Sequence, residues 1–106
     1  MKWSVEETIL LTDYVLGNDG ELPTEQQLTE LCDKLFPHRT ASSVYMQAWD
    51  VQAALGYNER ESWYSTQIGA IAELFKTDPI EMTNLAREIE LLRQTRRERP
   101  VPAHTE

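Results

Sequence analysis

Residues 24–56 read TEQQLTELCDKLFPHRTASSVYMQAWDVQAALG, and this stretch decides the fold class of the chain. Thr24 and Gln27 have the spacing of a capping box, in which two side chains satisfy free backbone N–H groups at a helix start. Apolar residues then recur at the interval typical of one buried helical face. They are Leu28, Leu31, Cys32, Leu35 and Phe36. The pattern predicts a helix that begins near Thr24 and buries this face, with the lone Cys32 as a structural thiol.

A second helix follows within the same stretch. Pro37 ends the preceding helix because proline cannot continue the backbone hydrogen-bond ladder, and Thr40 is a suitable cap for the next helix. Val44, Ala48, Val51 and Leu55 then repeat at helical spacing, and Gly56 follows where a helix end favours a residue without a Cβ. The short connection over residues 37–39 predicts a closely packed helix pair.

The flanking sequence predicts three more helices. Ser4 and Glu7 form a capping box before a face of Val5, Ile9, Thr12 and Leu16, and turn-forming residues 17–20 end that helix. The two later helices have these apolar positions: Ile68, Ile71, Ala72 and Phe75, then Met82, Leu85, Ala86, Ile89 and Leu92. Asp78 and Pro79 mark the start of the last one. We therefore predict an all-α domain over residues 1–99, with a tri-helical unit over 1–57, a two-helix extension over 58–99 and a flexible tail over 100–106.

The composition favours a folded, acidic chain. Of its 106 residues, 41% are hydrophobic, and 18 acidic residues outnumber 10 basic ones to give a net charge of -8. This sign repels phosphate backbones and favours basic partners. No apolar run approaches the length of a membrane span, and no signal-peptide core precedes Glu6 and Glu7, so we expect a cytoplasmic protein without a membrane partner.

Residue types that carry catalysis are sparse. A metal site needs three or four convergent ligands, whereas the chain has one cysteine and two distant histidines, His38 and His104. Neither a nucleophile motif nor a glycine-rich phosphate loop is present, with only four glycines in the sequence. We expect no enzyme activity, no metal and no cofactor.

Two features suggest binding. The close helix pair has the spacing of a helix-turn-helix, whose second helix would lie in a DNA groove. Its exposed candidates are Arg39, Thr40, Ser42, Ser43, Tyr45, Met46, Gln47 and Asp50. Asp50 on the same helix would repel the backbone. The alternative is that the pair only packs, with Tyr45, Met46 and Trp49 filling the core or a partner surface.

The second feature is an arginine cluster near the C-terminus, formed by Arg93, Arg96, Arg97 and Arg99. Such a cluster can attract nucleic acid through charge. The alternative is that it complements the dipole of its helix and aids solubility, since Glu88, Glu90 and Glu98 are interleaved.

The chain also resembles known families. Residues 3–7 with Leu10, Leu11 and Tyr14, followed by residues 28–31 and 39–45, are similar to a Myb/SANT-type tri-helical module. More specifically, the chain resembles the helical N-terminal region of bacterial HNH restriction-type endonucleases. The matching segments, in order, are Trp3-Ser4-Val5-Glu6-Glu7, Arg39, Ser43-Val44-Tyr45-Met46, Trp63, Phe75-Lys76-Thr77-Asp78 and Leu85-Ala86-Arg87-Glu88-Ile89.

This resemblance implies an accessory domain that engages DNA or organises an assembly, through Arg39, Thr40, Ser43, Tyr45 and Gln47. The family's His-Asn-His nuclease half does not occur in these residues, so the resemblance implies no endonuclease activity. Gln47 and Asp50 stand where the family often has Lys and Asn, which lowers the positive charge of the third helix.

Three hypotheses follow. The first is a DNA-associated, non-catalytic module. The second is an acidic protein-interaction domain that binds a basic protein, as a regulator or inhibitor of a nucleic-acid enzyme of the anti-defence type. The third is a homodimer through Trp49, Trp63 or Tyr64.

Overall fold

The structure, a computed structural model, describes residues 2–58 and 64–98 and is all-helical over these residues. Its five helices are α1 (Val5–Gly17), α2 (Glu25–Lys34), α3 (Ala41–Leu55), α4 (Thr66–Thr77) and α5 (Pro79–Glu98). The predicted all-α class and the number of helices are confirmed. The predicted tail over residues 100–106 lies outside the described part of the chain.

The helix ends follow the local signals in the sequence. Ser4 caps α1 and Thr24 caps α2, each with a complete capping box. The Thr40 hydroxyl accepts a hydrogen bond of 3.0 Å from the Ser43 N–H at the start of α3. Gly56 ends α3 with a left-handed backbone at φ 88°, where a side chain would be strained. All four predicted boundary residues are therefore confirmed.

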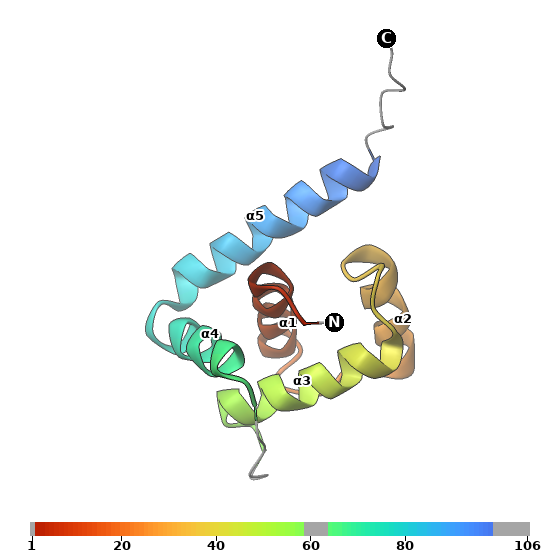
Figure 1. The fold of residues 1–106 in the computed structure, drawn as a ribbon. Coiled ribbons are helices and arrows are strands. Elements are labelled where there is room, and N and C mark those ends of the chain that lie inside the picture. Colours follow the sequence, from red (N-terminus) through yellow and green to blue (C-terminus); the bar gives the residue numbers. More distant parts are fainter. Residues whose placement is uncertain (1, 59–63, 99–106) are drawn as a thin grey trace.

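Helix α1 is the central element of the fold. Figure 1 shows α3, α4 and α5 arranged around it, and it packs against each of them. Leu11 and Val15 are fully buried, together with the polar residues Thr8 and Thr12. The Thr12 hydroxyl donates to the Thr8 carbonyl at 2.7 Å, which satisfies that buried polar group within the helix.

The apolar face predicted for this helix needs correction. Val5 is 54% exposed, while Leu10, Leu11 and Val15 are buried although they lie off the predicted stripe. A helix enclosed on several sides buries more than one stripe, so a single amphipathic face describes α1 poorly.

A single apolar cluster joins side chains from all five helices, so α1, α2 and α3 share their interior with α4 and α5. Val44, Ala48 and Val51 of α3 are buried as predicted. On α5, only part of the predicted face is buried: Met82, Ala86 and Ile89 are enclosed, whereas Leu85 and Leu92 are exposed. Among the described helices, none has an apolar stretch long enough to cross a membrane.

Candidate binding site

The α2–α3 connection has the tight geometry that the sequence predicted. Phe36 is fully buried after the end of α2, and its carbonyl accepts a 3.0 Å hydrogen bond from the Arg39 N–H. The ring of Trp3 meets the Phe36 ring edge-on, with centroids 5.2 Å apart. This contact places the connection beside the N-terminal turn of α1.

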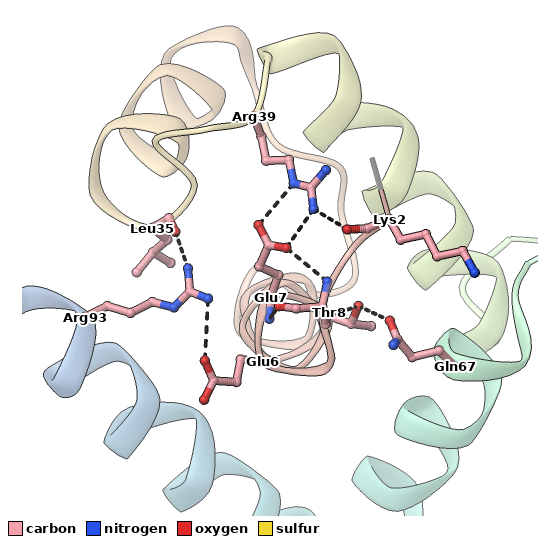
Figure 2. Close-up of polar contacts among 9 residues, drawn as sticks. Lys2, Glu6, Glu7, Thr8, Leu35, Arg39, Gln67 and Arg93 are labelled. Atoms are coloured by element: carbon pink, nitrogen blue, oxygen red, sulfur yellow. Dashed lines mark hydrogen bonds and ion pairs between the residues drawn. The ribbon is translucent and has the colours of Figure 1, made fainter.

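The Arg39 side chain points into the fold. Its Nε and Nη2 atoms donate to the two carboxylate oxygens of Glu7 at 3.0 and 2.7 Å, and Nη2 also donates to the Lys2 carbonyl at 2.7 Å (Figure 2). The guanidinium carbon lies 4.8 Å from the centre of the Trp3 ring, within cation–π range. Only 7% of the Arg39 side chain is exposed. The expectation that Arg39 lies on an outward DNA-reading face is therefore wrong. Its guanidinium pairs with Glu7 and so links the α2–α3 connection to α1.

Electrostatics support this reading of the pair. Burial alone would raise the pKa of Glu7, but hydrogen bonds from Arg39 and Ser4 lower it below its ordinary value. The hydrogen bond to Glu7 likewise raises the pKa of Arg39. Both groups are held in their charged forms, as expected for a structural ion pair.

The remaining residues predicted on α3 have varied surroundings. Thr40 is exposed but serves as the helix cap, and Ser43 and Gln47 are partly buried. Tyr45 packs edge-on against Trp49 with ring centroids 6.2 Å apart. Met46 is 65% exposed.

The outer face of α3 carries apolar and polar side chains but no positive charge, because residues 41–55 contain neither Lys nor Arg. Trp49 and Tyr64 are partly exposed and remain candidates for the predicted homodimer contact. Trp63 lies outside the described residues.

The C-terminal arginine cluster is only partly described. Arg93 donates to the Leu35 carbonyl at 2.9 Å and lies 3.7 Å from a Glu6 carboxylate oxygen. Figure 2 shows Arg93 and Arg39 both directed toward the N-terminal turn of α1, from α5 and from the α2–α3 connection. Arg96 and Arg97 belong to α5, but their side chains lie outside the described part, as does Arg99 altogether.

A groove between α1, α2 and α5 was not predicted from the sequence. It encloses about 310 Å³. Leu10, Leu31 and Leu35 supply its apolar lining, and the polar residues around them are Asp13, Tyr14, Gln27, Glu30, Lys34 and Glu90. Three carboxylates against one lysine give this groove a negative rim.

The carboxyl group of Asp13 is a partly buried member of this groove. Its burial raises the pKa of Asp13, Arg87 acts to lower it, and the nearby charge of Glu90 raises it further. Burial and the charge of Glu30 also raise the pKa of Tyr14. Among the described residues, no basic side chain lies within ion-pair distance of Asp13 or Glu90. The groove therefore contains the partly buried carboxyl groups of Asp13 and Glu90, which no described basic side chain neutralises through an ion pair.

The described residues contain no group of three or more His, Cys, Asp or Glu side chains placed to hold a metal ion. Cys32 is partly buried, and burial raises the pKa of its thiol, which disfavours the reactive thiolate. The resemblance to the N-terminal region of HNH endonucleases stays a prediction. When the chain is compared with protein-family models, curated proteins and solved structures, it matches none of them.

Proposed function

We propose that this chain is a non-catalytic, acidic protein-interaction module that binds a basic protein. A regulator or inhibitor that covers the basic surface of a nucleic-acid enzyme is a function of this kind. The net charge of -8 supports a basic partner.

One observation carries the proposal: the described arginines of this region bind groups inside the fold, whereas the carboxylates of the groove have no ion-pair partner among the described residues. Arg39 and Arg93 are directed at Glu7, Glu6 and backbone carbonyls. DNA recognition needs cations directed at phosphates and base edges. The described surface of α3 supplies none, so it favours a protein partner over a nucleic acid.

Two binding measurements test this proposal. Fluorescence anisotropy at low salt, with a labelled polyarginine peptide and a labelled DNA duplex of about 20 base pairs, compares the two classes of partner. We expect the peptide to bind and to dissociate as salt is raised, and we expect the duplex not to bind. Duplex binding with a steep salt dependence, together with absent peptide binding, would replace the proposal by the DNA hypothesis and its remaining arginines, Arg96, Arg97 and Arg99.

A further inference from the structure

The groove between α1, α2 and α5 has two properties that together define an occupant. Its leucine lining is apolar, and its rim carries Asp13 and Glu90, whose charges are close enough for Glu90 to raise the pKa of Asp13. Two like charges in a partly desolvated position repel each other, and a cation placed between them relieves this repulsion. Apolar contact and positive charge are therefore required of the same ligand.

The groove is open because of the way the helices pack. Helix α2 packs mainly against α3, while α5 packs against α1 and α4 (Figure 1). The groove left between them is lined mostly by α1 and α2, with Glu90 from α5. Among the described residues, no cation forms an ion pair with Asp13 or Glu90. Arg93 reaches the Leu35 carbonyl and Glu6, Lys34 lines the groove itself, and the charge of Arg87 lowers the pKa of Asp13 from beyond ion-pair distance. Because Arg87 and Lys34 form no ion pair with them, Asp13 and Glu90 can still pair with a cation from outside.

The size of the groove restricts what can enter. About 310 Å³ lies at the lower end of the roughly 300–1,000 Å³ of ligand pockets, which suits one long side chain and excludes a whole helix. Arginine fits this chemistry better than lysine. Its aliphatic stem can lie on leucines, and its planar guanidinium can bridge two carboxylates and stack on an aromatic ring such as that of Tyr14.

We infer that this groove receives an arginine side chain presented by an amphipathic, basic helix of the partner protein. The arginine stem lies along Leu31 and Leu35, and its guanidinium lies between Asp13 and Glu90. Leucines one turn away on the partner helix cover the rim of the groove. This inference rests on the proposed function and gives it a site and a partner chemistry.

A peptide pair tests the chemistry of the occupant. The probe is a fluorescein-labelled helical peptide with one arginine between leucines one turn away on each side, and its partner carries citrulline, the neutral isostere, instead of arginine. We expect the wild-type protein to bind the arginine peptide at least about tenfold more tightly, because charge-assisted hydrogen bonds exceed neutral ones by this order.

A matched pair of double variants tests the site. Asp13→Asn with Glu90→Gln removes both groove carboxylates and is expected to abolish the tenfold preference for arginine. Asp33→Asn with Glu88→Gln removes the same charges from exposed positions of α2 and α5 outside the groove, and is expected to retain the preference. Circular dichroism melting verifies that both proteins are folded.

The outcomes separate the two proposals. If the wild-type protein binds the arginine peptide but both double variants lose the preference equally, the groove is not the site, and the protein-interaction function stands. If the wild-type protein binds neither this peptide nor polyarginine, the proposed function fails together with the groove. Equal binding of the arginine and citrulline peptides overturns the arginine as the recognised group.

Discussion

Replacing Arg39 by alanine is expected to destabilise the fold strongly. In the structure, Arg39 makes two hydrogen bonds to the Glu7 carboxylate and one to the Lys2 carbonyl, and it lies over the Trp3 ring. The side chains of Arg39 and Glu7 are 7% and 13% exposed. Removing one member of such a pair leaves the other charge poorly solvated, which costs about 3–5 kcal/mol in buried pairs.

We expect the lower end of this range, about 3 kcal/mol, because Glu7 keeps its hydrogen bonds with Ser4 at the start of α1. For a domain of this size, that loss lowers the melting temperature by on the order of 15 °C. Arg39→Lys keeps the charge but loses the two-pronged geometry, so an intermediate loss is expected.

Urea unfolding of the single variants and of the double variant with Glu7→Gln measures the coupling free energy between the two side chains. A value of about 2 kcal/mol is expected for two groups in direct contact. Lys2→Ala, which removes a positive charge from an exposed side chain and keeps the Lys2 carbonyl that accepts from Arg39, is the control and should change stability by less than about 0.5 kcal/mol. A coupling energy near zero, with Arg39→Ala as stable as this control, would refute the structural role of the pair.

Acid sensitivity gives an independent measure of the same pair. Because the pKa of Glu7 in the folded chain lies below its ordinary value of 4.5, the pair contributes stability above that pH. This contribution is lost as the pH falls through the lowered pKa. Glu7→Gln should therefore flatten the pH dependence of stability in this acidic range.

Three further predictions concern other positions. Gly20→Ala is expected to destabilise the fold by about 2 kcal/mol, because its backbone has φ 77° and a Cβ would overlap the Tyr57 ring. Gly17→Ala, where an added Cβ meets no neighbouring atom, should stabilise the fold by about 0.5 kcal/mol. Equal urea midpoints for the two variants would contradict both expectations. Thr24→Ala removes the cap of α2 and should cost about 1 kcal/mol in the same assay, with an unchanged midpoint as the contrary result. The pKa of Asp13 is raised above 3.8 in the folded chain, so stability falls as the pH rises from 3.8 through the raised pKa. Asp13→Asn should therefore be more stable than wild type at neutral pH, and the difference should shrink in acid. A less stable variant at neutral pH would count against this.

The sequence predicted the features of the fold that depend on neighbouring residues. Capping boxes span four residues and a helix-ending glycine acts at its own position, so Ser4, Thr24, Thr40 and Gly56 were identified without tertiary information. The same locality explains why five helices could be recognised.

Features that depend on distant residues were not predicted. Arg39 and Glu7 are 32 positions apart, and no local pattern indicates that they pair, so Arg39 was assigned to a DNA-reading face. The groove combines residues from three helices and depends on how α5 crosses α1. Asp13 and Tyr14 lie next to the buried face of α1. The position of the charged Asp13 beside this apolar face was the one local sequence signal for a groove.

The central place of α1 has a consequence for synthesis on the ribosome. Of the five described helices, α1 is translated before α3, α4 and α5, which must cover its sides. Until α5 has been made, Leu10, Leu11 and Val15 lack part of their final surroundings, and exposed apolar surface promotes aggregation of nascent chains. Truncation before α4 should thus yield an insoluble product, and folding of the five helices should wait until α5 has been synthesised.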